Sequence, residues 1–125
     1  MNLEETMQAA VEHQRSGRFS EAARLYGAVL EERPDDTRAL ELLGWIRYQE
    51  GDYGAAAAYF ERVVAVDPAN GGAYHTLGNI YYDTGDPDRA IVCYQEALRR
   101  DGGNAEIYNS LGIALKETGR IEQRS

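Results

Sequence analysis

Apolar residues recur along this chain at the spacing of one helix face. Within 73–84, the positions i, i+3, i+4 and i+7 are Tyr74, Leu77, Gly78 and Tyr81. Within 88–100, the same kind of face is formed by Ala90, Ile91, Tyr94, Ala97 and Leu98. This spacing is typical of amphipathic helices, and the residues between the two segments, 85–87, are turn formers. The stretch 71–104 is therefore predicted to fold as a pair of helices.

The same pattern recurs every 34 residues. One step upstream of Gly78 is Gly44, and one step downstream is Gly112. A fixed period of this length indicates stacked helix pairs. We expect a single domain over 1–125, with full repeats at 3–36, 37–70 and 71–104 and a partial repeat at 105–125.

Several helix ends can be predicted from residue type. The first helix is expected over Leu3–Ser16 and to stop at Gly17, because glycine accepts the left-handed backbone of a helix end. Ser20 is expected to cap the start of the second helix. The helix of the partial repeat is expected over 105–118, with Gly119 as its stop.

Small residues are predicted to set the distance between paired helices. Gly44 and Gly78 on the first helices, with Ala56 and Ala90 on the second helices, should let the two backbones approach closely. A bulkier residue there would cost about 1–3 kcal/mol by overpacking.

The partial repeat leaves an apolar helix without its pair. Its inner stripe is predicted to be Tyr108, Leu111, Gly112 and Leu115. Three explanations stay open: the chain is cut from a longer array, the stripe is a tolerated cap, or it binds another molecule. In the last case Tyr108, Leu111 and Leu115 would form a self-association face, giving a homo-oligomer.

These residues resemble the tetratricopeptide repeat (TPR) family over nearly the whole chain. The family has a large apolar residue at the fourth place of each repeat, Leu-Gly at the seventh and eighth, and small residues at the twentieth and twenty-seventh. The repeat at 71–104 matches with Tyr74, Leu77, Gly78, Ala90 and Ala97. The resemblance implies an all-α, right-handed superhelical solenoid of antiparallel helix pairs, with about seven helices.

The resemblance also implies a binding surface. First helices of TPR proteins line a concave groove, which here would present Val11, Arg38, Glu41, Leu42, Trp45, Tyr48, His75, Asn79, Tyr82, Asn109 and Ile113. The residue pattern supports this separately, because Leu40, Leu43 and Ile46 already fill an inner face of 37–50. Trp45 and Tyr48 then lie on an adjacent face, where exposed aromatic residues are typical of binding hot spots.

Composition narrows the partners. The formal net charge is −8, and no basic block occurs, so phosphate backbones and anionic lipids are disfavoured. No apolar run approaches the roughly 20 residues that cross a bilayer. Cys93 is the only cysteine, which suits a reducing compartment. We expect a cytoplasmic protein with a protein or peptide partner, no nucleic acid and no membrane insertion.

Catalytic chemistry is not indicated. His13 and His75 occupy different places in their repeats, and no metal-binding, nucleophile or phosphate-loop motif occurs. His75 is interpreted as a groove residue rather than a metal ligand, and Cys93 as a packed thiol. The sequence therefore predicts no enzymatic activity, no cofactor and no metal site.

Two further comparisons refine the function. TPR proteins that clamp a C-terminal carboxylate use Lys, Asn and Arg at places that here hold other residues, including Glu41, Trp45 and Thr76. The phrases at 17–26 and 78–82 are similar to TPR arrays that precede bacterial O-linked glycosyltransferase domains. We therefore expect a protein-interaction scaffold that binds a segment in its groove. The alternatives are a TPR segment of such an enzyme and a self-assembling module.

Overall fold

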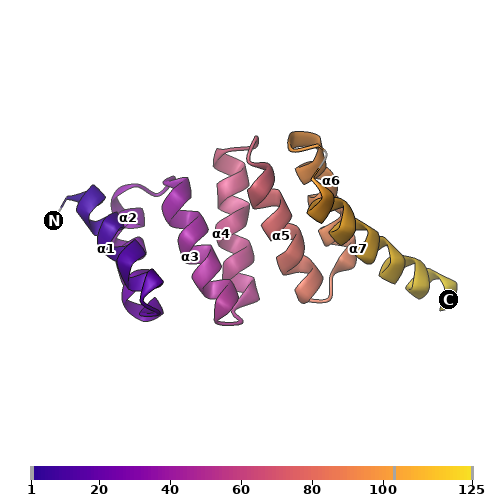
Figure 1. The fold of residues 1–125 in the computed structure, drawn as a ribbon, viewed down its shortest axis with the longest axis horizontal. Helices are drawn as coiled ribbons and strands as arrows, with labels where there is room; N and C mark the ends of the chain where they lie inside the picture. The colour runs from indigo at the N-terminus through magenta and orange to yellow at the C-terminus, as the bar shows by residue number, and fades with distance from the viewer. Residues whose placement is uncertain (1, 103, 125) are drawn as a thin grey trace. The chain divides into compact units, whose positions relative to one another are not determined.

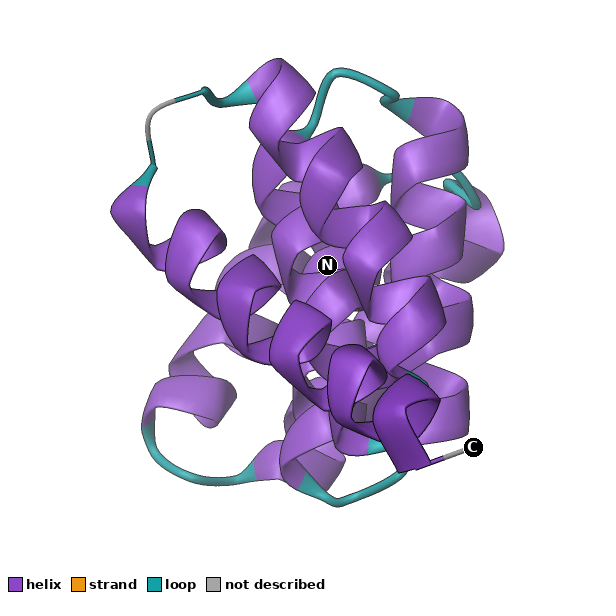
Figure 2. Ribbon diagram, turned by 90° about the vertical axis from the view of Figure 1, so that its right-hand side faces the viewer, coloured by secondary structure: helices purple, strands orange, loops and turns teal. Residues whose placement is uncertain are grey.

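The computed structural model describes residues 2–102 and 104–124, and this part of the chain contains seven α-helices and no strand (Figure 2). The helices are α1 (Leu3–Arg15), α2 (Phe19–Glu32), α3 (Thr37–Gln49), α4 (Tyr53–Val66), α5 (Gly71–Asp83), α6 (Pro87–Arg100) and α7 (Ala105–Arg124). The all-α prediction is confirmed. The chain divides into two compact units, Met1–Val66 and Asp67–Ser125, which are described separately. The division into four repeats stays a prediction.

The first unit contains α1 to α4, each packed on the next along the chain (Figure 1). Apolar side chains from α1, α2 and α3 form its core, with Ala10, Tyr26, Val29 and Ile46 fully buried. Half-buried residues such as Phe19 pack around this core. Because consecutive helices are joined by short turns, neighbours run in opposite directions.

The second unit contains α5, α6 and α7, with α6 packed against both of the others (Figure 1). Its core is built around Tyr94, whose neighbours Ala90, Ala97, Ile107 and Ala114 are almost completely buried. Small residues on α6 and α7 thus leave room for one large aromatic ring.

Three glycines end helices as their types predict. Gly17, Gly51 and Gly85 have φ of 79°, 82° and 82°, the left-handed region that favours glycine. The N–H of the next residue then bonds back into the finished helix, as from Arg18 to the carbonyl of His13 at 2.8 Å. This pattern fits the glycine stop that terminates many helices.

Side-chain caps begin several helices, but Ser20 is not one of them. The capping oxygens belong to Asp36, Asn70 and Asp86, which accept from the backbone N–H of Ala39, Ala73 and Arg89 at 3.0, 2.9 and 3.2 Å. The prediction for Ser20 is wrong, because α2 begins at Phe19, two residues before the start that a Ser20 cap would give, with Arg18 in the cap position and no side-chain bond. Burial of Phe19 against the core favours the earlier start.

The predicted stop at Gly119 is also wrong, since α7 continues from Ala105 to Arg124. Glycine permits a helix end but does not require one. At Gly17 the chain turns back at once into a helix that packs on the one just finished. No such returning helix follows Gly119 within the described residues, so nothing offsets the loss of further helical hydrogen bonds.

Two glycines at the eighth place of a predicted repeat, Gly44 and Gly78, face aromatic rings. A Cβ at Gly44 would lie 2.9 Å from Cε2 of Phe60, and one at Gly78 would lie 2.6 Å from Cε1 of Tyr94. The sequence predicted close approach at these glycines and named alanines as the opposing residues. The structure instead places an aromatic ring of the second helix over each of them.

The stripe predicted on α7 lies mostly outside the core of the second unit. Ile107 and Ala114 are buried, Leu111 is half-buried against the core, and Tyr108 and Leu115 are exposed by 56% and 49%. The predicted stripe copied the face that α5 turns toward α6. Helix α7 has no following partner among the described residues, so only the face toward α6 is covered.

Candidate functional site

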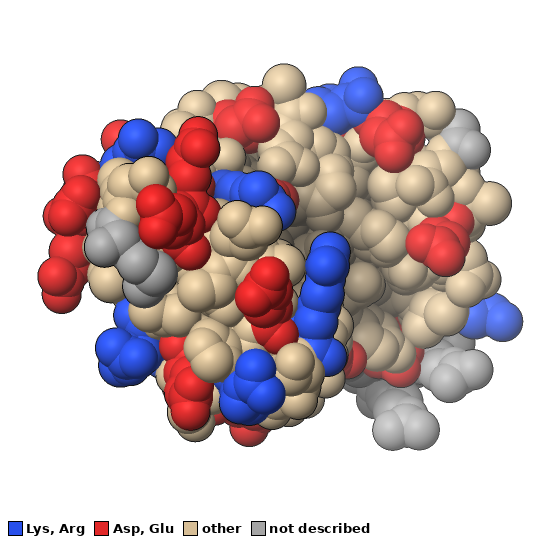
Figure 3. Space-filling view, turned by 60° about the vertical axis from the view of Figure 1, so that its left-hand side comes forward, with Lys and Arg blue, Asp and Glu red and all other residues tan. Residues whose placement is uncertain are grey.

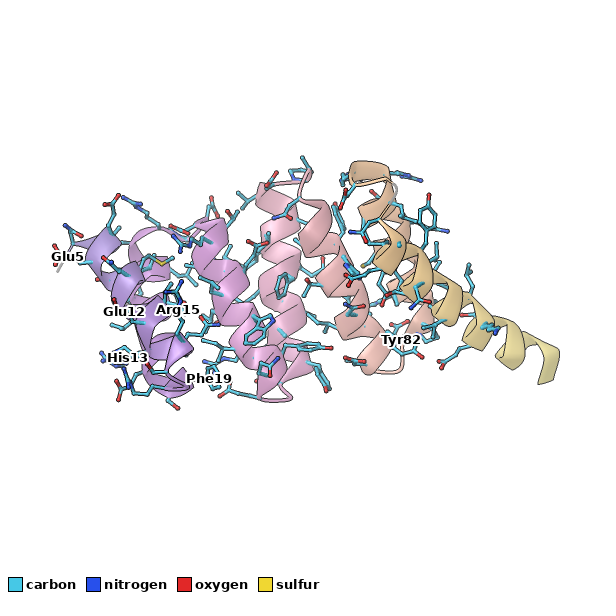
Figure 4. All side chains as sticks on the ribbon, viewed as in Figure 1. Glu5, Glu12, His13, Arg15, Phe19 and Tyr82 are labelled. Carbon is cyan, nitrogen blue, oxygen red and sulfur yellow. The ribbon has the colours of Figure 1, made fainter. Side chains whose placement is uncertain are left out.

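A pocket of about 460 Å³ opens on the first unit between α1, the start of α2 and α3. It is lined by Val11, Gln14, Arg15, Phe19, Arg38, Leu42 and Trp45. Figure 4 labels Arg15 and Phe19, which lie on the side of α1 and α2 that faces α3, whereas His13 points away from it. Four of the eleven predicted groove residues are thus brought together in one pocket.

Helical periodicity places these side chains there. On α3, Leu40, Leu43 and Ile46 turn inward and are buried. Arg38, Leu42 and Trp45 follow one another at i, i+4 and i+7, so they share the neighbouring face. The exposed fraction of Trp45 is 42%. The indole is therefore available to a ligand.

A hydrogen bond from the core orients one side of the pocket. The hydroxyl of the buried Tyr26 donates to Oε1 of Gln14 at 2.6 Å. Burial raises the pKa of Tyr26, and the positive charge of Arg38 opposes that rise. The phenol accordingly stays a neutral donor at physiological pH and fixes the Gln14 amide at the pocket wall.

Phe19 is a lining residue that the sequence pattern did not indicate. A cap at Ser20 would place Phe19 in the link before the helix. Its position as the first residue of α2 puts its ring beside α1 and α3 instead. The available signal was a large apolar residue just after the Gly17 stop, which in a turn exposed to water would have no packing partner.

A second cavity of about 570 Å³ adjoins this pocket in the same unit and shares Val11, Arg15 and Arg38 with it. Its other lining residues include Met7 and the charged set Glu4, Glu12, Arg33 and Asp36. Of these two cavities, the second is lined by carboxylates and the Trp45 pocket is not. On the face shown in Figure 3, basic and acidic side chains are interspersed among uncharged ones.

Two other predicted groove residues of the first unit lie on α3 outside the pocket. Glu41 and Tyr48 are both half-buried. The ring of Tyr48 lies 5.4 Å, centroid to centroid, from that of Tyr53. Tyr48 thus packs along its own helix pair, and Trp45 is the more accessible of the two aromatic residues.

In the second unit, predicted groove residues are joined to their own core. The nearly buried Tyr94 donates a hydrogen bond from its hydroxyl to Oδ1 of Asn79 at 2.6 Å. The ring of His75 packs edge-on against the ring of Tyr94, with 6.0 Å between the two ring centroids. Tyr82 donates to Oε1 of Glu117 at 2.7 Å. These bonds fix the α5 side chains.

Two groove residues on α7 are open to solvent, Asn109 and Ile113. Their exposure leaves them free of the core of the second unit, in contrast to the half-buried residues of α5. The structure thus places the eleven predicted residues in two sets, one in each compact unit.

Tyr94 has the strongest electrostatic perturbation in this unit. Burial raises its pKa to about 12, and a hydrogen bond with Ser110 opposes part of that rise. Because its hydroxyl and ring contact groups on α5 and α7, the neutral phenol links the three helices. Its role is structural, since nothing about it is directed to solvent.

The described residues also bear on metal binding and membrane insertion. Within 2–102 and 104–124, no three His, Cys, Asp or Glu side chains gather closely enough to hold a metal ion. Among the helices described here, none combines the length and apolar character that crossing a bilayer requires.

Helix pairs that repeat at a fixed period define an α-helical repeat protein. The chain belongs to the tetratricopeptide repeat family: the family profile described as "Tetratricopeptide repeat" matches residues 7–73, and a profile described as "TPR repeat" matches residues 78–119. The fold class is accordingly the all-α TPR solenoid.

Solved structures give the same fold. An O-GlcNAc transferase mutant from Thermobaculum terrenum is similar over 90% of this chain with 33% identity and a TM-score of 0.78, and this chain spans 22% of its length. MamA matches over 94% of this chain and 69% of its own, with 23% identity and a TM-score of 0.89. The curated proteins compared gave no match.

This chain is also similar in fold to a TPR structure that contains a bound peptide. The first TPR of Spaghetti (RPAP3), bound to an HSP90 peptide, matches over 94% of this chain and 93% of its own. The identity is 15% and the TM-score is 0.87, so this likeness shows the fold alone.

Proposed function

We propose that this chain is a non-catalytic interaction module that binds a peptide or protein segment along the faces of its first helices. The observation that carries the proposal is the exposed indole of Trp45 in a 460 Å³ pocket. Pockets of a few hundred Å³ with apolar walls and a few placed polar groups are the usual form of a binding site.

The energetics of an exposed tryptophan favour binding over a purely structural role. Trp45 is 42% exposed and is not part of the first core, whereas Leu42 beside it packs against that core. Tryptophan in a rigid concave wall is among the residues that contribute most to binding free energy. Peptide capture by the RPAP3 TPR structure supports the same class of function for this fold.

The second unit, taken by itself, has accessible groups on α7. Asn109 and Ile113 are exposed there, and they can supply a hydrogen bond and an apolar contact to a bound segment. Asn79 and Tyr82 would act mainly by shaping the wall, because their oxygens already bond to Tyr94 and Glu117.

The test is selection of binders from a random peptide display library, using the full chain as bait. Selected peptides are synthesised with a fluorescent label, and binding is followed by anisotropy. Replacing Trp45 by Ala should weaken binding at least tenfold, since hot-spot truncations cost about 2 kcal/mol or more. Val92→Ala is the matched control, because Val92 is 58% exposed on α6, outside the first-helix faces.

Two results would contradict the proposal. One is equal affinity of the wild-type chain and the Trp45→Ala variant for every selected peptide. The other is an equal loss on Val92→Ala, which would move the binding surface to the second helices.

A second candidate is a TPR segment of a larger enzyme of the O-linked glycosyltransferase type. The 33% identity with the T. terrenum enzyme over 90% of this chain favours it. The genomic reading frame around the coding sequence tests it directly. A catalytic domain in frame would support this candidate, and a frame without one would exclude it.

A further inference from the structure

The polar side chains that line the Trp45 pocket offer N–H donors, and the one acceptor among them, Oε1 of Gln14, is already bonded to the Tyr26 hydroxyl. These side chains belong to Gln14, Arg15 and Arg38, and no Asp or Glu lines this pocket. This arrangement is unexpected in a chain with 21 acidic and 13 basic residues. A pocket of this kind favours an anion that accepts hydrogen bonds.

The two guanidinium groups are also available. The ion pairs between described residues use other cations, and neither Arg15 nor Arg38 has a hydrogen bond or ion pair in the described part of the chain. Both side chains are exposed. Arginine presents a planar set of donors that matches a carboxylate in a bidentate pair.

Gln14 adds a third donor, because its amide has one orientation. The Tyr26 hydroxyl occupies Oε1 at 2.6 Å, and the ring of Tyr26 is fully buried, so it cannot swing away. The amide nitrogen of Gln14 has no partner among the described residues. Its two N–H groups are therefore left for a ligand.

The rest of the pocket is apolar, with Phe19, Leu42 and Trp45 on its walls. A free inorganic anion would leave these walls uncovered, and a nucleic acid would be repelled by the net charge of −8. We infer that the pocket takes a peptide segment in which a Glu or Asp side chain neighbours a large apolar side chain. This inference rests on the proposed function and names the chemistry of its ligand.

The recognised group would be a side-chain carboxylate within a segment. The places that clamp a chain-terminal carboxylate in other TPR proteins here hold residues such as Met7, Val11 and Leu42, which lack the necessary donors. The donors lie instead at the twelfth and thirteenth places of the first repeat and at the second place of the next.

The experiment uses the full chain and a library of random hexapeptides displayed between fixed linkers, so that no terminal carboxylate is offered. Selected sequences should be enriched in Glu or Asp beside Phe, Trp, Leu or Ile. Synthetic copies with blocked ends should lose about tenfold in affinity when the acid is replaced by its amide. The double variant Arg15→Gln and Arg38→Gln should lose a similar factor.

Arg24→Gln is the matched control, because Arg24 is an exposed arginine on α2 that does not line the pocket. Its binding should equal that of the wild-type chain. Reversing the charge with Arg15→Glu and Arg38→Glu should turn the selection toward Lys and Arg. Circular dichroism checks that each variant is folded. We expect folding to be kept, because both arginine side chains are exposed.

The outcomes separate the two proposals. Peptides that bind through Trp45 without acidic residues, or equally to the double glutamine variant, would overturn the inference and leave the proposed function standing. Binding that requires a free C-terminus would also overturn it. If no peptide binds above the level of the Trp45→Ala variant, both proposals fail.

Discussion

A methyl group added at Gly78 should separate helices that the same methyl group at Gly112 leaves untouched. Both glycines occupy the eighth place of a repeat on a first helix. At Gly78 a new Cβ would lie 2.6 Å from Cε1 and 2.7 Å from Cδ1 of Tyr94, whereas at Gly112 nothing lies within 4 Å. The two substitutions are therefore chemically identical. They differ in whether an aromatic ring from a neighbouring helix lies against the new methyl group.

The size of the effect follows from the freedom of the Tyr94 ring. The ring is 2% exposed, and its hydroxyl bonds to Asn79 at 2.6 Å, so it has little room to move. Overpacking of this kind costs about 1–3 kcal/mol. Alanine exceeds glycine in helix propensity by about 1 kcal/mol. Gly78→Ala should thus destabilise by about 0–2 kcal/mol, while Gly112→Ala should stabilise by about 1 kcal/mol.

The measurement is urea unfolding of both variants and the wild-type chain, followed by far-ultraviolet circular dichroism. The difference between the two variants is the informative quantity, because the propensity contribution cancels and about 1–3 kcal/mol of steric cost remains. In a thermal scan this corresponds to roughly 4 °C for each kcal/mol. Equal unfolding free energies for the two variants would refute the idea that the Tyr94 ring sets the helix spacing.

Three further predictions concern caps, pH and the open face of α7. Asp36→Ala should lower the unfolding free energy by about 1 kcal/mol through loss of a helix cap. Ser20→Ala should leave the unfolding free energy unchanged within about 0.5 kcal/mol. If urea unfolding shows the same loss of stability for both variants, Ser20 is a cap after all. Because burial raises the pKa of Tyr94 to about 12, the unfolded chain releases this proton first, near pH 10, and stability should fall as the pH rises from about 10 to 12. The expected loss is about 2–3 kcal/mol, and a Tyr94→Phe variant that loses stability just as steeply in alkaline unfolding would contradict it. If the exposed face of α7 mediates self-association, replacing Tyr108 and Leu115 by Lys should lower the sedimentation coefficient at high concentration; a wild-type chain that sediments only as a monomer would rule this out.

Much of the fold could be predicted from the sequence because it depends on local rules. Helical spacing and a fixed period predicted the family and the all-α fold. Gly17 ended its helix as expected, since a left-handed φ is a property that glycine has by itself. Leu40, Leu43 and Ile46 were predicted to face inward, and they are buried for the same periodic reason.

The errors arose where a residue's role depends on what packs against it. Ser20 has the chemistry of a cap, but α2 begins two residues earlier than such a cap would give, since Phe19 packs against the core. Gly119 has the freedom to stop a helix, yet α7 continues because no later described helix turns back on it.

The sequence by itself determined the period, the helices and the class of surface that could bind a ligand. Tertiary structure alone brought Phe19 beside Trp45, and it alone directed the Gln14 amide through its bond to Tyr26. Periodicity fixes which side of a helix a residue occupies, because that depends on backbone geometry within a few turns. Which side chains share a pocket depends on contacts between helices that are far apart in the chain, and no local pattern contains that information.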